Sequence, residues 1–180
     1  LVLTARFIVV ALNFGTAAAV LVIAARMRRR LFTALEVTPT PFDRLEWSIV
    51  AVVMLLCWVA LSRSIEFRPE PMALALMAFA WLALDLARDR GRGSRFGAVA
   101  IAAILCGIAV AFTPRSVFFS AGLLLGYSAV FSRGRWRSFL AFSVLAAALG
   151  AATSAAGLFP FASWAEIQEY VLDVNLAFER

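Results

Sequence analysis

The residues best suited to chemistry lie in one short stretch, SRSIEFRPEP, at residues 62–71. Glu66, Arg68 and Glu70 alternate there, and a proline stands on each side of Glu70. A carboxylate beside an arginine stays ionised, and such a pair can orient a hydroxyl group or hold a phosphate. Glu66 and Glu70 are therefore candidate general bases, and Arg68 is a candidate substrate-binding residue. An ordinary hydrated loop, whose charges only fix the topology, fits the same residues, and spacing alone favours that interpretation.

Arg115 is a second candidate for binding an anion. It follows Pro114, and a proline disfavours helical conformation at the residue before it, so we expect a helix to end at Thr113. Arg115 then lies at the tip of a tight helical hairpin. Its side chain can either extend to the phosphates of lipid head groups or turn inward and hold an anionic ligand.

The elements that carry these residues must be membrane-spanning helices. Of the 180 residues, 63% are hydrophobic, which exceeds what a soluble domain of this size needs. A helix that crosses the bilayer needs roughly 17 to 20 apolar residues, and an open strand edge cannot be satisfied in lipid. We predict an all-α fold, a polytopic transmembrane bundle over residues 1–159. Its six expected spans are about 5–25, 46–62, 71–87, 97–113, 116–131 and 139–159.

The basic residues predict the orientation of these spans. All 17 are arginines, and most fall in the connections after the first, third and fifth spans. The positive-inside rule places these connections in the cytoplasm. Residues 63–70, 113–115 and 160–180 then lie on the outer side, in a membrane that we expect to be the bacterial inner membrane. Short arginine clusters between apolar spans do not indicate nucleic-acid binding.

The last segment, 160–180, has apolar residues at helical spacing, at Trp164, Ile167, Val171, Val174 and Phe178. We expect an amphipathic helix on the outer membrane surface, and the start of a further soluble domain is a compatible alternative. The chain begins with leucine and shows no signal peptide. We therefore expect a fragment of a longer polypeptide, the alternative being a complete small protein whose start is missing.

Other residues give weaker signals. The chain has no histidine, and Cys57 and Cys106 lie in apolar spans without a CxxC partner, so no metal site is predicted. Asp85 precedes Arg88 by about one turn, and we expect a local ion pair there. Small residues in the fifth and sixth spans indicate close helix packing inside the chain rather than a dimer; they are Gly122, Gly126, Gly150, Ser154 and Gly157.

The order of these pieces resembles the polytopic membrane glycosyltransferases of the GT-C class, especially protein mannosyltransferases and aminoarabinose transferases. Those enzymes often have an aromatic residue before an R-P-D/E sequence that opens a helix, and then a helical hairpin of the type G-x-A-x-x-x-T-[KR]-x-[ST]. The first motif corresponds to residues 67–70, FRPE. The second corresponds to Gly107, Ala109, Thr113, Arg115 and, with shifted spacing, Ser116.

The resemblance covers most of the chain and implies transfer of a sugar from a polyprenyl-phosphate donor at the outer membrane face. It also implies that Arg68 and Glu70 line the cavity and that Arg115 lies near the donor phosphate. The family's principal catalytic acid lies on its first outer loop, and we expect this chain to begin after that loop. This piece alone would then be inactive by that mechanism, and the sequence identifies no cofactor.

A different class of function fits the same composition. The chain could be a non-enzymatic polytopic subunit that packs against a larger membrane complex, with membrane lipids and other membrane subunits as its partners. Substitution of Glu70 or Arg68 separates the two hypotheses, because only the enzyme depends on their chemistry.

Overall fold

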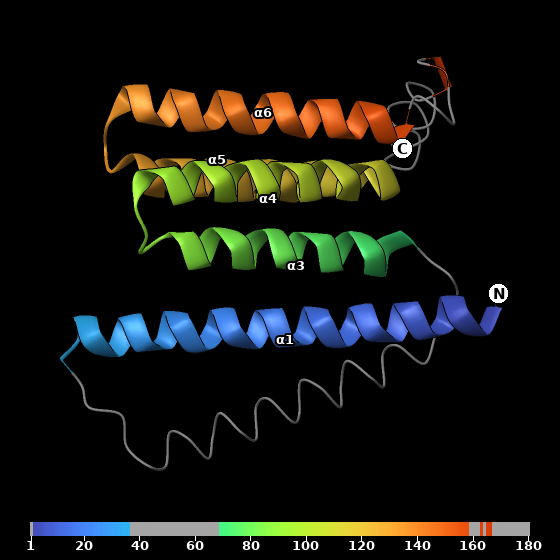
Figure 1. Ribbon diagram of the computed structural model, residues 1–180, viewed down its shortest axis with the longest axis horizontal. Coiled ribbons are helices and arrows are strands. Elements are labelled where there is room, and N and C mark those ends of the chain that lie inside the picture. Colours follow the sequence, from blue (N-terminus) through green and yellow to red (C-terminus); the bar gives the residue numbers. More distant parts are fainter. Residues whose placement is uncertain (1, 37–68, 159–162, 164, 167–180) are drawn as a thin grey trace, which may run out of the picture.

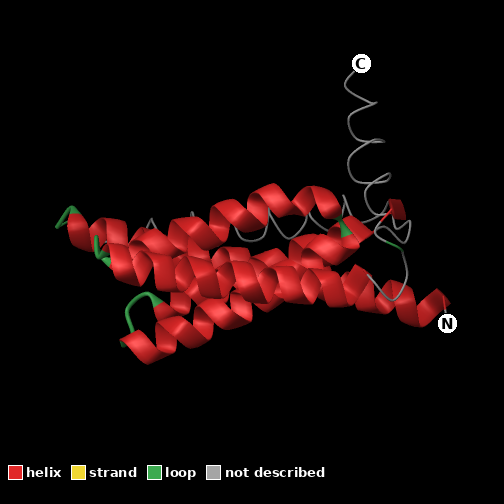
Figure 2. Cartoon of the chain, turned by 90° about the horizontal axis from the view of Figure 1, so that it is seen from above, coloured by secondary structure: helices red, strands yellow, loops and turns green. Residues whose placement is uncertain are grey.

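The computed structural model describes residues 2–36, 69–158, 163 and 165–166. Within 69–158, short turns join consecutive helices (Figure 1). The helices are α1 (Val2–Ala34), α3 (Pro69–Ala87), α4 (Arg92–Phe112), α5 (Val117–Ser132) and α6 (Trp136–Leu158), with a 3₁₀ turn η1 (Pro114–Ser116) between α4 and α5. Seen from above, the axes of these helices are roughly parallel to one another (Figure 2). An all-α bundle is therefore confirmed for the described residues.

Four of the described helices are long and apolar enough to cross a membrane, so the chain belongs among integral membrane proteins. These spans are Val10–Ala34, Arg92–Phe112, Pro114–Ser132 and Trp136–Leu158, and Met72–Ala87 is a shorter apolar helix. The described residues thus give four candidate spans rather than the six predicted. The prediction also counted 71–87, where the structure has the shorter apolar helix Met72–Ala87, and 46–62, which lies outside the described residues.

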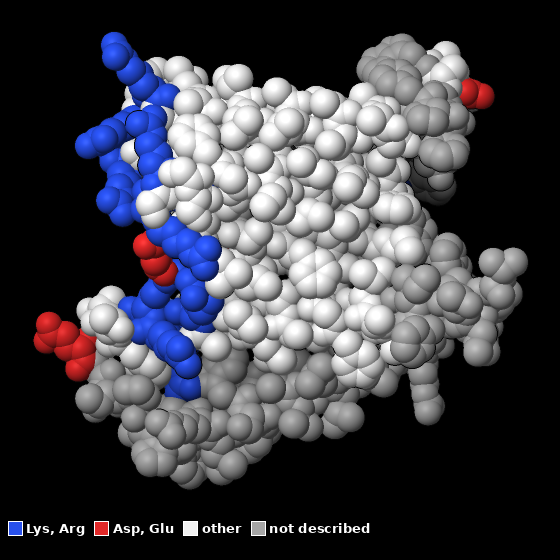
Figure 3. Space-filling view, viewed as in Figure 1, with Lys and Arg blue, Asp and Glu red and all other residues white. Residues whose placement is uncertain are grey.

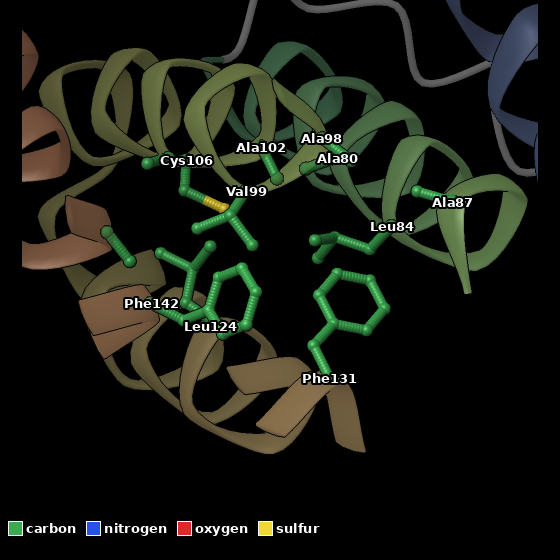
Figure 4. Packing of buried hydrophobic residues seen from close by; sticks show 12 residues of the cluster. Ala80, Leu84, Ala87, Ala98, Val99, Ala102, Cys106, Leu124, Phe131 and Phe142 are labelled. Carbon is green, nitrogen blue, oxygen red and sulfur yellow. The ribbon is translucent and has the colours of Figure 1, made fainter. Parts of the chain in front are cut away.

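Helix α4 lies at the centre of the bundle and packs against α3, α5 and α6, while α1 packs against α3. Its inward face joins a core in which half of the buried residues are alanine, and larger side chains from the neighbouring helices complete it (Figure 4). Phe142 of α6 lies at the middle of an aromatic group, with ring centroids 4.4 Å from Phe96 and 5.8 Å from Phe131. Cys106 is part of this core, as expected of a small hydrophobic residue.

Helix α6 approaches α4 very closely, because small residues face each other there. A methyl group added at Gly107 would lie 1.8 Å from Thr153 Oγ1 and 2.6 Å from the carbonyl oxygen of Gly150. The hydroxyl of Ser154 donates a hydrogen bond across the same contact to the Gly107 carbonyl, at 3.0 Å. The expected internal packing of small residues is confirmed for α6.

The same expectation is wrong for the GxxxG pattern of α5. Gly122 and Gly126 are exposed, and in the described part of the chain nothing lies within 4 Å of a methyl group added at either. Helix α5 instead contacts its neighbours through larger side chains, including a hydrogen bond from Trp81 of α3 to the hydroxyl of Tyr127, at 3.1 Å. The pattern therefore lies on an outer face of the described bundle.

The turns end the helices for local reasons. Thr113 is extended, with φ of −145° and ψ of 96°, as expected of a residue before proline. Between α5 and α6, Arg133 and Gly134 both adopt positive φ angles, of 50° and 79°, which reverse the chain direction. After α6, the N–H of Ser163 donates to the Glu166 carboxylate at 2.7 Å and the N–H of Glu166 donates to the Ser163 hydroxyl at 3.4 Å, as in a helix capping box. The remainder of the predicted outer helix lies outside the described residues.

Replacing Gly107 with alanine should destabilise the bundle by about 1–3 kcal/mol, because the methyl group meets backbone as well as the Thr153 side chain. Gly122→Ala is the matched control, since the space around it is open and alanine favours a helix. The free energy of unfolding in detergent micelles, followed by circular dichroism, measures both. Equal stability of the two variants would contradict the close contact.

Candidate functional site

The predicted site residues belong to one end of the bundle as far as they are described. Glu66 and Arg68 lie outside the described residues. Glu70 is in the first turn of α3, and Arg115 is exposed in η1. Helices α3 and α4 are antiparallel neighbours, so the start of α3 and the end of α4 meet the same end of the bundle (Figure 1). Two of the four predicted residues thus share one end.

Arg115 owes its position to the proline before it. Pro114 opens the 3₁₀ turn, and the N–H of Ser116 donates to the Thr113 carbonyl at 2.9 Å. The turn is only three residues long, so α4 and α5 connect with almost no excursion from the bundle. The Arg115 side chain therefore lies at the boundary of two apolar spans.

The opposite end carries the arginines of three segments, the end of α1, the α3–α4 connection and the α5–α6 turn (Figure 3). The described ones are Arg26, Arg28, Arg29, Arg30, Arg88, Arg90, Arg92, Arg95, Arg133, Arg135 and Arg137. The sequence correctly predicted that these segments share one end.

An ionic cluster at this end joins α1 to α3. Asp85 is 1% exposed and accepts hydrogen bonds from Arg26 Nε and Arg30 Nη1, both at 2.5 Å. Asp89, one turn further along α3, is exposed and accepts from the same two arginines, at 3.2 Å and 2.9 Å. The expected local pair of Asp85 with Arg88 is thus wrong: the carboxylate of Asp85 binds two arginines of another helix.

The sequence does contain a signal for this cluster. Arg26 and Arg30 are four residues apart, as are Asp85 and Asp89, so each pair occupies one helix face. Both pairs lie at helix ends that the span count already placed on the same side. Our prediction searched for a partner of Asp85 on its own helix. A comparison of the two four-residue patterns would have identified the ionic cluster.

This cluster has the properties of a structural contact rather than a reactive centre. Each Asp85 oxygen accepts a hydrogen bond from a guanidinium group of α1, so both oxygens take part in the contact between the two helices. Among the described residues, no group of three or more potential metal ligands of the His, Cys, Asp or Glu type occurs. The cluster therefore fixes α1 against α3.

We find no match to this chain among protein-family models, curated proteins or solved structures. The fold and the distribution of charge therefore define its class, an integral membrane protein built as a polytopic helical bundle with arginines at one end.

Replacing Asp85 with asparagine should cost about 3 kcal/mol of stability, because two partly buried guanidinium groups lose their shared buried carboxylate. Asp89→Asn should cost at most about 1 kcal/mol, since that side chain is 64% exposed and its ion pairs are screened by solvent. The free energy of unfolding in detergent separates the two. A larger loss for Asp89→Asn would show that the contact is anchored elsewhere.

The pH dependence of stability should change when Asp89 is replaced. A hydrogen bond from Arg30 lowers the pKa of the Asp89 carboxyl below its ordinary value of 3.8. A carboxyl with a lowered pKa in the folded state stabilises the protein above its ordinary pKa, and this contribution is lost as the pH falls through the lowered value. The stability difference between the native chain and Asp89→Asn should therefore be constant above about pH 5 and shrink below pH 4. A difference independent of pH across this range would exclude the ion pair.

Proposed function

We propose that this chain is part of an integral membrane glycosyltransferase that takes its sugar from a polyprenyl-phosphate donor. Glu70 and Glu66 are its proposed catalytic carboxylates, and Arg68 and Arg115 its proposed donor-binding residues. The observation that carries the proposal is the shared location of the start of α3 and of η1, at the end of the bundle opposite the arginine-rich one (Figures 1 and 3).

The sidedness follows from the positive-inside rule, which puts the arginine-rich end in the cytoplasm of a bacterial inner membrane. The start of α3 and η1 then face the outer side, where the site would lie at the membrane boundary. A lipid-linked donor presents its phosphate at that depth, and cationic side chains there bind it by charge-assisted hydrogen bonds. A carboxylate nearby can accept the proton of the acceptor hydroxyl.

Six spans remain part of this proposal. Helix α1 ends at the arginine-rich end and α3 begins at the opposite end (Figure 1). The proposed span at 46–62 would connect these two ends. Helix α3 has 19 residues, and a helix of that size is about 28 Å long, close to the thickness of the hydrocarbon core.

The test is sugar transfer in membranes that contain the protein as the cell makes it. Glu70→Gln should lower transfer at least about 100-fold, the usual contribution of a general base, and Arg68→Ala and Arg115→Ala should weaken use of the polyprenyl-phosphate donor. Arg137→Ala is the matched control, since this exposed arginine lies at the opposite end. Transfer of radiolabelled sugar, normalised to the protein level, is the measurement. Unchanged transfer in all three variants would refute the proposal.

A non-enzymatic subunit of a larger membrane complex is the second candidate, and the outer faces of α5 and α6 favour it. Gly122 and Gly126 of α5 are exposed, as are Ala148, Ala152 and Ala156 of α6, each set at a four-residue spacing. Small residues at this spacing allow another helix to approach closely. If the outer-end variants of the transfer assay are silent while Gly126→Leu changes the size of the native complex, the subunit function holds instead.

A further inference from the structure

A pocket of about 520 Å³ opens at the arginine-rich end, away from the predicted catalytic residues. It lies between the α3–α4 connection, the first turn of α4 and the α5–α6 turn. Its charged lining residues are Asp89, Arg90, Arg92, Arg95, Arg133 and Arg135, and parts of Phe131 and Phe142 form its apolar wall. Three separate segments of the chain thus contribute arginines to one space.

The charge of this pocket is not neutralised by the described part of the chain. Asp89 is its one acidic lining residue, and its carboxylate already binds Arg26 and Arg30 of α1. Within the described residues, no ion pair joins a carboxylate to any of the five arginines that line the pocket. An unpaired group of five guanidinium ions attracts an anion.

Arg95 gives the pocket a buried donor. Its side chain is only 9% exposed, and its guanidinium lies over the ring of Phe131, 5.8 Å from the centroid. Its Nη2 donates to the carbonyl of Arg88 at 3.1 Å, but its buried Nε has no hydrogen-bond partner among the described residues. A buried N–H without an acceptor costs free energy, so the chain itself leaves part of the hydrogen-bonding capacity of this pocket-lining guanidinium unused.

The start of α4 adds to the same effect. Gly91 caps this helix without any side-chain hydrogen bond, and the first turn contains no acidic residue. The free N–H groups of a helix N-terminus carry partial positive charge and bind phosphate well. Gly91 and Arg92 both line the pocket, so the helix end and the Arg95 guanidinium face one space.

We propose that this pocket binds a phosphate group at the membrane boundary. Arginines suit phosphate because their planar donors pair with its oxygens, and the exposed Trp136 beside the α5–α6 turn is typical of the membrane–water interface. The phosphate has two possible sources, the head group of an anionic phospholipid and a free phosphorylated solute. The site is independent of the proposed glycosyl transfer, because it lies at the opposite end of the bundle.

The experiment uses the full chain, purified in a neutral detergent. Phosphatidylglycerol should raise the unfolding temperature, and phosphatidylcholine should not. Arg133→Gln and Arg135→Gln should each weaken phosphatidylglycerol binding about fivefold, the usual effect of one arginine near an anionic lipid. Arg95→Gln should weaken it further. Arg137→Gln is the matched control, since it removes the same charge from the same end of the bundle outside the pocket, and it should bind as the native chain does.

A parallel arm with inorganic phosphate identifies the source. If phosphate alone stabilises the chain with the same dependence on Arg133 and Arg135, the site binds a soluble anion. If only phosphatidylglycerol does so, it binds a lipid head group. Arg133→Gln and Arg135→Gln keep the test decisive if Arg95→Gln fails to fold. The proposal is overturned if neither ligand stabilises the native chain, or if Arg137→Gln weakens binding as much as the pocket variants do.

Discussion

The buried contact of Asp85 with Arg26 and Arg30 is the interaction on which the rest of this bundle depends. Between helices in lipid the hydrophobic effect provides little driving force, because lipid tails are as apolar as the side chains. An apolar face alone would therefore let α1 slide along α3. A buried carboxylate that needs both guanidinium groups allows one register only, because any shift leaves a charge unpaired. This register places the end of α1 level with the α3–α4 connection.

The remaining helices are held by shape rather than charge. Gly107 and Gly150 let α4 and α6 approach until Ser154 can reach the Gly107 carbonyl, and dispersion contacts then extend over the whole interface. On the other side, Phe131 of α5 packs edge to face against Phe142 of α6. The small residues set the distance between α4 and α6, and the aromatic residues fill the wider gap between α5 and α6. Both kinds of contact keep the α5–α6 turn beside the start of α4, where the arginine pocket forms.

The sequence predicted the helices well but their ends and contacts less well. Hydropathy gave 5–25 for a helix that extends over Val2–Ala34, because it detects only the apolar part while arginine is itself a good helix former. The break at Pro114 was predicted closely, since proline acts through local sterics. The partner of Asp85 was predicted wrongly, because sequence distance does not show which helix lies next to which. The same limit applies to Gly122 and Gly126, whose spacing says that a helix can pack there but not that one does. For the candidate site, the order of the spans along the sequence was enough to predict that Glu70 and Arg115 lie at the same end of the bundle.

Within the arginine-rich end, two groups of arginines use their charge in opposite ways. Arg26 and Arg30 form ion pairs with Asp85 and Asp89, so these two arginines mainly fix α1 against α3. The arginines of the two turns have no such acidic partners among the described residues, and they gather around Arg95, where an α-helix also begins. Paired charges would have sufficed to fix the topology. Unpaired ones, with a buried donor among them, repel one another and lower stability unless an anion joins them. The arginine-rich end is therefore most stable when a phosphate occupies its pocket, which ties the packing of α4, α5 and α6 to the composition of the surrounding membrane or solution.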